Sequence, residues 1–345
     1  MTVAINTREF DLLRDFIARE TGISLATDKV YLVETRLREI MRSEGIEDFS
    51  ALHEVLLAGR SASLKAKVLD AMTTNETLWF RDSLPFDVFR DILLPAYAAE
   101  IQQGKRKKIR IWSAACSTGQ EPYSLVMTFL EAARTNPTLE PGQLDILATD
   151  YSDKALAQAK AGKYGSMAMS RGLPEGYRGK YFSPAGNDFE VNREIRDPVV
   201  FRKFNLQDSF VMMGNFDIIL TRYVLIYFSD DFKREVLRKA HGALEKGGVL
   251  FVGSSESLPE GSTGFSLIRS GRATYYQKVE GAVGSAVPGP VKTAREPEKI
   301  LAPARSVASS DQHSKAGLEK ATEDLAEIVK RLQDMNARYS RKTDH

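Results

Sequence analysis

This 345-residue sequence has few of the residues that form disulfides and metal centres. Its one cysteine, Cys116, excludes an internal disulfide and suits a reducing compartment. Only four histidines are present, and none lies near Cys116 along the chain. We therefore interpret the thiol as a small packing residue rather than a nucleophile, and we predict no metal-binding residues.

Long apolar runs are also missing. No stretch approaches the length of a membrane-spanning helix, and residues Met1–Asn6 lack the apolar core of a signal peptide. We therefore expect a cytoplasmic protein without membrane insertion. The formal net charge of +2 is too small to indicate nucleic-acid binding. The length allows one large core or two modest domains.

The most informative stretch is Ile109–Ser124, which reads IRIWSAACSTGQEPYS. Its β-favouring start predicts a strand, its small residues from Ser113 to Gly119 predict a tight turn, and Pro122 suits the first turn of a helix. Such a unit can bind a nucleotide, because backbone N–H groups at the turn point at the ligand. The alternative is an ordinary buried core.

A second predicted strand, Leu144–Asp150, ends in an acid that can accept hydrogen bonds from both hydroxyls of a ribose. The turn after the first strand contains one glycine, Gly119, where the dinucleotide fingerprint has three, and the chain has no Walker-type lysine. A nucleoside without phosphates fits better than a dinucleotide. S-adenosylmethionine is the commonest ligand of that kind.

Alternating strands and helices predict an α/β fold with a doubly wound, mostly parallel, seven-stranded sheet. Helices are expected at Leu84–Gln103, at Asp153–Lys160, and from Ser229 to about Glu245, where Gly247 and Gly248 would end the helix. The later strands are expected at Val199–Phe204, Phe216–Leu220 and Val249–Gly253, followed by an antiparallel hairpin of Phe265–Ile268 with Ala273–Val279.

Four segments of different composition follow one another along the chain. Residues 1–72 predict a helical domain, and residues 73–280 the sheet domain, with an antiparallel β-insert at about 172–200. Its strands are expected near Gly179–Ser183 and Phe189–Ile195. Residues 281–314 predict a disordered linker, and residues 315–345 an amphipathic or coiled-coil helix. That helix would fold back on the body, self-associate, or dock on a helical partner.

Two polar segments allow two interpretations each. The junction Met72–Asp82 is either an N-capped helix start or a polar lid that its aromatic residues hold over a pocket. The second helix of the N-terminal domain carries a basic face, which is either solvated or a docking surface. The basic residues are Lys29, Arg36, Arg38 and Arg42.

Four motifs resemble, in order and spacing, the CheR family, the glutamate O-methyltransferases of chemotaxis receptors. They are TTNETLWFRD (Thr73–Asp82), WSAACSTGQEPYS (Trp112–Ser124), ILATDYS (Ile146–Ser152) and VLIYF (Val224–Phe228). The resemblance extends from about Thr7 to Val279. It implies S-adenosylmethionine as cofactor, S-adenosylhomocysteine as product, and methyl-accepting chemotaxis receptors as partners, whose cytoplasmic helices receive methyl esters during adaptation.

The resemblance also implies a site. Glu121 and Asp150 would bind the amino-acid and ribose ends of the cofactor, and Asn205 and Leu206 would border the adenine. The other expected cofactor contacts are Asn75, Thr77, Arg81, Arg222 and Tyr223. Arg81 and Tyr227 can also hold the acceptor carboxylate. That carboxylate, with a pKa of roughly 4.3, is charged at neutral pH and needs no general base.

One departure from the family leaves an alternative open. The family usually has Cys-Arg-Asn before VLIYF, whereas this chain has Thr221-Arg222-Tyr223. A non-catalytic S-adenosylmethionine-binding module with a scaffolding C-terminal helix is therefore the second hypothesis. A nucleic-acid methyltransferase is disfavoured, because the Asn/Asp-Pro-Pro-aromatic tetrapeptide of amino-methylating enzymes is absent.

Overall fold

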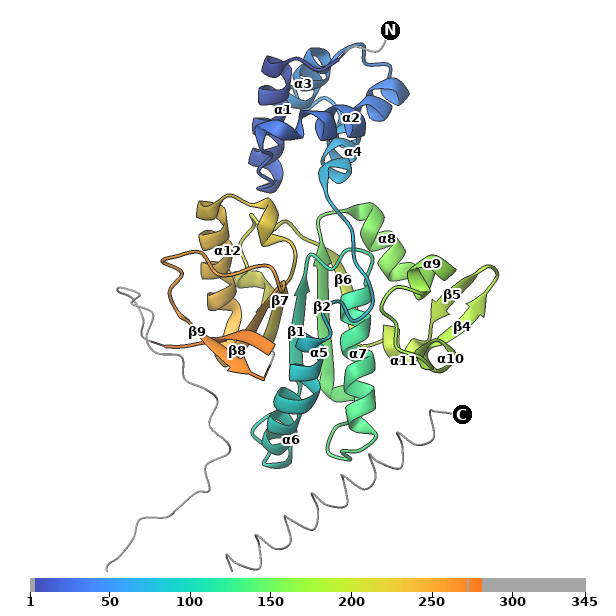
Figure 1. Ribbon diagram of the computed structural model, residues 1–345, viewed down its shortest axis with the longest axis vertical. Coiled ribbons are helices and arrows are strands. Elements are labelled where there is room, and N and C mark those ends of the chain that lie inside the picture. Colours follow the sequence, from blue (N-terminus) through green and yellow to red (C-terminus); the bar gives the residue numbers. More distant parts are fainter. Residues whose placement is uncertain (1–3, 272, 281–345) are drawn as a thin grey trace, which may run out of the picture. The chain divides into compact units, whose positions relative to one another are not determined.

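The computed structural model describes residues 4–271 and 273–280 (Figure 1). The linker and the C-terminal helix predicted for residues 281–345 lie outside the described residues. Among the helices that are described, none is both long and apolar enough to cross a membrane.

Four helices form the N-terminal helical domain. Asn6 and Glu9 form a capping box that starts the first helix, and Gly22 and Gly45, in the left-handed conformation, end the first and second. The apolar faces meet in a core of their own, in which Leu13, Val33 and other large side chains are fully buried. The helices are α1 (Thr7–Thr21), α2 (Val30–Glu44), α3 (Phe49–Leu57) and α4 (Ala62–Met72).

The predicted doubly wound, mostly parallel sheet is confirmed. Seven strands lie in the order β6-β2-β1-β7-β8-β10-β9. The first five are parallel, and β10 pairs antiparallel with β8 and with the edge strand β9. The strands are β1 (Ile109–Ala114), β2 (Leu144–Asp150), β6 (Val199–Lys203), β7 (Phe216–Thr221), β8 (Leu244–Val252), β9 (Phe265–Ser270) and β10 (Ala273–Lys278).

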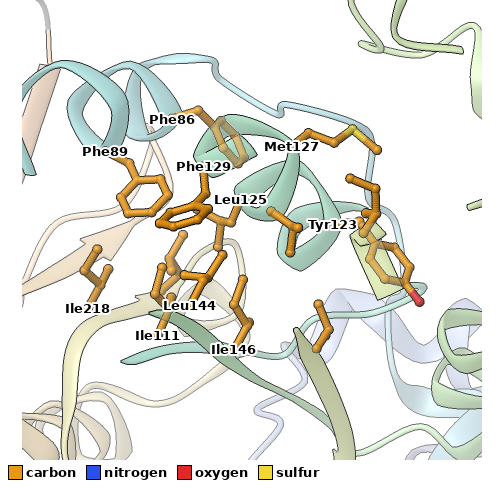
Figure 2. Close-up of a cluster of buried hydrophobic side chains, with 14 of the residues drawn as sticks. Phe86, Phe89, Ile111, Tyr123, Leu125, Met127, Phe129, Leu144, Ile146 and Ile218 are labelled. Carbon is orange, nitrogen blue, oxygen red and sulfur yellow. The ribbon is translucent and has the colours of Figure 1, made fainter. Parts of the chain in front are cut away.

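Side chains alternate between the two faces of this sheet, and each face has its own core. Figure 2 shows Leu125 and Phe129 of α7 (Gln120–Ala133) directed toward Ile111 and Ile146 of the sheet. Trp112, next to Ile111, belongs to the cluster on the opposite face, together with residues of α12 (Asp230–Ala243). Helices therefore cover both faces, as expected for a doubly wound fold.

Two predicted helices differ from the observed ones. Leu84–Gln103 is divided into α5 (Leu84–Val88), a π-helical turn η2 (Phe89–Leu93) and α6 (Leu94–Gln102), because Pro95 lacks the N–H that a regular ladder requires. Gly247 and Gly248 do not end α12. They lie within β8, where pairing moves from Phe216–Leu244 to Ile218–Val249 and residues 245–248 bulge out of the ladder.

The β-insert is present, but its strands differ from those predicted. A small antiparallel sheet has the order β3 (Lys163–Tyr164), β5 (Asp188–Val191), β4 (Phe182–Ala185), and strand β3 was not expected. Much of Gly179–Ser183 is helical, because α10 covers Tyr177–Tyr181 and β4 begins at Phe182. The strand predicted at Phe189–Ile195 is observed as β5, which is shorter and ends at Val191. The remaining elements of this region are α8 (Asp153–Ala161), α9 (Ser166–Met169), β5 (Asp188–Val191) and α11 (Arg193–Arg196).

The strand order fixes the location of the ligand crevice. From β1 the chain first adds β2 and β6 on one side, then returns to add β7 and β8 on the other. The reversal lies between β1 and β7, and ligands of such sheets bind beyond the carboxyl ends of the strands there. The small-residue turn after β1 and the segment after β7 meet at this position.

Candidate functional site

One pocket contains every site residue that the sequence predicted. It measures about 1030 Å³ when the open space at its mouth is included. The strand ends, the junction after α4 and the end of α1 all contribute to its lining. The predicted residues in the lining are Asn75, Thr77, Arg81, Glu121, Asp150, Asn205, Leu206, Arg222, Tyr223 and Tyr227.

We call the Ser113–Gly119 turn, Glu121 and Asp150 the strand-end wall. The turn has a demanding backbone, with φ of 60° at Ala115, 51° at Ser117 and 93° at Gly119. Any side chain at Gly119 would be strained, because of this positive φ and because a Cβ atom there would lie 3.0 Å from Cβ of Ala159. α7 then begins at Gln120 without a side-chain cap, which leaves its first N–H groups directed toward the pocket end of the helix.

Asp150 is buried at the end of β2, and the backbone holds it in place. Its Oδ2 accepts from the N–H of Ser117 at 2.8 Å, and its Oδ1 accepts from the N–H of Ser152 at 2.9 Å. Burial raises the pKa of this carboxyl, although the backbone hydrogen bonds oppose that shift. A carboxylate has about four acceptor positions, so the two oxygens retain capacity for a ligand's hydroxyl groups.

Arg222 connects the two sides of the pocket. Its side chain is 2% exposed, and its Nη1 donates to Oε2 of Glu121 at 2.8 Å. Nη2 donates to Oδ2 of Asp82 at 2.9 Å and to the carbonyl of Arg81 at 2.5 Å. Nε is buried without a partner in the described part of the chain. The Nη donors of Arg222 are thus directed to protein acceptors, and its observed contacts join strand β7, helix α7 and the junction.

The junction is a lid held down by aromatic residues, in agreement with the second of the two interpretations. Residues 73–77 line the pocket and have no regular secondary structure. Trp79 is fully buried and packs edge-to-face against Tyr164 and Phe182 of the β-insert. The hydroxyl of Ser117 donates to the carbonyl of Asn75 at 2.7 Å, which joins the lid to the strand-end wall.

The basic helix α2 also contributes to the lid. Nη1 of Arg36 donates to the carbonyls of Ala71, Met72 and Thr73 at 3.0–3.2 Å. These carbonyls lie at the end of α4, where no intrahelical donor is available. Arg36 is therefore part of the junction rather than of a solvated face, whereas Arg38 of the same helix forms an ion pair with Glu34.

We call Arg81, Asp82, Tyr223 and Tyr227 the junction wall. The guanidinium carbon of Arg81 lies 3.6 Å from the centre of the Tyr223 ring, and Nη1 of Arg81 donates to the carbonyl of Glu76 at 3.0 Å. The Tyr223 hydroxyl hydrogen-bonds to Asp82. Burial raises the pKa of Asp82, but the hydrogen bond from Tyr223 and the nearby Arg222 outweigh it and lower the pKa overall.

Strained backbone is concentrated around this pocket. In residues 4–271 and 273–280, every non-glycine residue with positive φ lies in the turn, in the junction or directly after it, or just beyond β7. Such conformations are unfavourable for most side chains and persist only where the surroundings enforce them, often at functional sites. These residues are Phe80, Asp82, Ser83, Ala115, Ser117 and Tyr223.

Sequence reasoning missed Glu256, which organises the segment after β7. Its Oε2 accepts from the N–H groups of Tyr223 and Gly253 at 2.7 Å each, and its Oε1 accepts from that of Ile226 at 3.1 Å. Glu256 lies in the loop after β8, in none of the recognised motifs, so no pattern indicated it. Asp82 was inside a recognised motif, but nothing in the sequence indicated its contacts with Tyr223 and Arg222.

The helical domain also contributes to the pocket, which the sequence did not predict. Thr21 and Ile23, at the end of α1, line it. Ile23 forms an isolated antiparallel bridge with Phe228, and the N–H of Ser24 donates to the carbonyl of Tyr227 at 2.7 Å. These contacts hold the backbone at Tyr227, which belongs to the junction wall.

The remaining predicted residues differ in how they are held. Nδ2 of Asn205 donates to the carbonyl of Glu20 at 2.8 Å, so this amide also ties the strand end to α1. Nδ2 of Asn75 donates to the hydroxyl of Thr73 at 3.0 Å. Leu206 is buried at 8% exposure, and Thr77 lines the pocket without a side-chain hydrogen bond in the described structure.

Comparison with known proteins gives two family matches that together span most of the described chain. Residues 8–73 match the all-alpha domain of CheR methyltransferases, and residues 75–274 match the S-adenosylmethionine-binding domain of CheR methyltransferases. The boundary between the two matches falls in the junction.

Individual relatives are similar over nearly their whole length. Chemotaxis protein methyltransferase 1 of Pseudomonas aeruginosa is 44% identical over 251 residues, which cover 72% of this chain and 90% of that protein. Chemotaxis protein methyltransferase Cher2 of Pseudomonas putida is 40% identical and is covered over 97% of its length, against 78% of this chain. A chemotaxis protein methyltransferase of Vibrio parahaemolyticus is 41% identical over 80% of this chain and 98% of its own.

Proposed function

Since this chain belongs to the CheR methyltransferase family and uses S-adenosylmethionine as its cofactor, we propose that it methylates glutamate side chains of chemotaxis receptors. The products would be a glutamate methyl ester and S-adenosylhomocysteine. The observation that carries this proposal is the pocket itself, whose lining brings together the buried carboxylate of Asp150, the guanidinium of Arg81 and the phenol of Tyr227.

The residues of the strand-end wall suit the cofactor. Asp150 has acceptor capacity left for two ribose hydroxyls, and we assign it to that role. Glu121, held by Ser113 at 2.8 Å and by Arg222, is an acceptor suited to the cofactor's amino group. The rest of the proposed cofactor site is lined by Asn75, Thr77, Asn205 and Leu206. Of these, Asn205 and Leu206 would lie beside the adenine.

The junction wall suits an acceptor carboxylate. When bound, the cofactor supplies an electrophilic methyl group on a positively charged sulfur. Arg81 offers a guanidinium that can hold a carboxylate, and Tyr227 offers a hydroxyl with no hydrogen-bond partner among the described residues. A glutamate is already ionised at neutral pH, so these groups have only to orient it and exclude water. The pocket contains no histidine, and Cys116, whose pKa is raised well above its usual value by burial, is not a base.

Receptor helices are the proposed partners, and the cytoplasm is the proposed location, where the receptors' methylation helices lie. We also propose that the predicted C-terminal helix, outside the described residues, self-associates or docks on a helical partner such as the receptor bundle. An enzyme tethered in this way would act at a higher local concentration.

Transfer of a labelled methyl group to a receptor methylation-helix peptide tests the function. The expected result is incorporation into the peptide with glutamate at the methylation position and none into the matched peptide with glutamine there, since an amide is not a nucleophile of the required kind. Binding of S-adenosylhomocysteine without any transfer would instead support the second hypothesis, a non-catalytic cofactor-binding module. The departure at Tyr223 is the feature that favours it.

A further inference from the structure

Tyr223 is held more tightly than a pocket-lining side chain needs to be. Its N–H donates to Glu256 at 2.7 Å, and its hydroxyl bonds to Asp82 and lies 2.8 Å from Oγ of Ser254. A Cβ atom at Gly253 would lie 2.8 Å from Oε2 of Glu256 and 3.0 Å from Cδ1 of Tyr223, so any larger residue there would have to displace one of these groups. The position of the aromatic ring is therefore set by the backbone, by two side chains and by a close glycine.

The backbone conformation at position 223 is unfavourable for a tyrosine. Its φ is 57°, in the left-handed region, which asparagine tolerates and large aromatic residues disfavour. A tyrosine that occupies such a position against its conformational preference indicates that its side chain has a role. The side chain contacts Arg81, whose guanidinium carbon is 3.6 Å from the centre of the ring.

We propose that Tyr223 is the positioning residue for Arg81 and sets how the acceptor carboxylate can approach. The stack covers one face of the guanidinium, and the carbonyl of Glu76 engages Nη1. An arginine side chain otherwise has many rotamers, and fixing it before the acceptor arrives removes an ordering cost from the reaction. This inference rests on the proposed function, because it assigns Arg81 to the acceptor.

Two substitutions separate the ring from its hydroxyl. Tyr223→Phe retains the stack on Arg81 and loses the bonds to Asp82 and Ser254. Tyr223→Asn restores the residue expected from the motif and removes the stack. We expect kcat/KM for the receptor peptide to fall about tenfold in Tyr223→Asn and by less than about threefold in Tyr223→Phe. The resemblance implied that Tyr223 contacts the cofactor, but its ring is stacked on Arg81 and its hydroxyl is bonded to Asp82, so we expect the Kd of S-adenosylhomocysteine to be unchanged in both.

The arginine provides an independent test. Arg81→Lys retains the positive charge but not the planar group, so it should lose about as much kcat/KM as Tyr223→Asn. In an Arg81→Ala background, Tyr223→Asn should have no further effect, because Tyr223 acts through Arg81. Thermal unfolding of each variant identifies losses that are due to misfolding, and Arg81→Lys decides the matter if Tyr223→Asn does not fold.

Three results would overturn the inference. The first is a full additional loss from Tyr223→Asn in the Arg81→Ala background. The second is a parallel loss of S-adenosylhomocysteine affinity, which would make Tyr223 a cofactor contact. The third is wild-type kcat/KM in Tyr223→Asn. A wild-type enzyme that transfers no methyl group to the peptide would refute the proposed function itself, and this inference with it.

Discussion

The two walls of the pocket are built by different means. In the strand-end wall, the backbone places the functional groups: Asp150 ends a strand, and two N–H groups fix its carboxylate. In the junction wall, side chains hold other side chains: the Arg81 guanidinium stacks on the Tyr223 ring, and the Tyr223 hydroxyl hydrogen-bonds to Asp82. The first arrangement follows from a strand–turn–helix unit. The second depends on individual residues.

Removing the residue that joins the walls should have the largest effect. Arg222→Ala would leave the carboxylates of Glu121 and Asp82 without their cation in a largely buried setting. Loss of one member of a buried ion pair costs about 3–5 kcal/mol, so the free energy of unfolding should fall by that amount.

Urea denaturation measures this effect, and Arg234→Ala is the matched control. Arg234 pairs with Asp231, whose side chain is 97% exposed, so the control should change stability by less than about 1 kcal/mol. Equal changes in the two variants would mean that Arg222 does not join the walls.

A substitution confined to the junction wall should leave the affinity for the cofactor nearly unchanged. Arg81→Ala removes the proposed carboxylate ligand, and a misplaced acceptor costs about a hundredfold in turnover. Steady-state kinetics with a receptor peptide and calorimetry with S-adenosylhomocysteine should show a large fall in kcat and little change in Kd. Equal losses in both quantities would make Arg81 a plain cofactor ligand.

A substitution confined to the strand-end wall should instead weaken the binding of the cofactor. Asp150→Ala removes charge-assisted hydrogen bonds worth about 1.5–3 kcal/mol, so S-adenosylhomocysteine should bind at least about tenfold more weakly, without loss of the fold. Calorimetric titration is the measurement. Asp153→Ala, which replaces an exposed acid close by in sequence, should bind normally. Unchanged affinity in Asp150→Ala would contradict the assignment of the crevice.

The smallest expected effect is on pH dependence. Burial raises the pKa of Asp150 above its ordinary value of 3.8, so its carboxylate takes up a proton at a higher pH than an exposed aspartate would. A proton occupies an acceptor position, and the affinity for S-adenosylhomocysteine should therefore fall a few-fold as the pH decreases toward that raised pKa. Asp150→Asn, neutral at every pH, should bind weakly and without this dependence.

The difference between the walls also explains what could be predicted from the sequence. Strand β1, the turn, α7 and the acid at the end of β2 each leave a local pattern of β-favouring residues, small residues and helical spacing. Parallel strands then bring their carboxyl ends together, which is why Asp150 and Arg222 could be expected in one crevice.

Contacts between distant side chains left no such pattern. Glu256 binds three N–H groups from loops that are separate in sequence, and Arg36 reaches three carbonyls of another helix. One short strand was missed altogether: β3, with two residues, carries too few side chains to show a period. Gly247 and Gly248 resembled a helix end because a bulge and a C-cap both favour glycine.

The chemical nature of the product tests the central claim most directly. If the junction wall orients a glutamate carboxylate, the labelled product is a methyl ester. Raising the pH of the labelled receptor peptide should then release the label as volatile methanol. Label that stays on the peptide in alkali would indicate methylation of nitrogen, and would contradict glutamate methylation and the assigned role of Arg81.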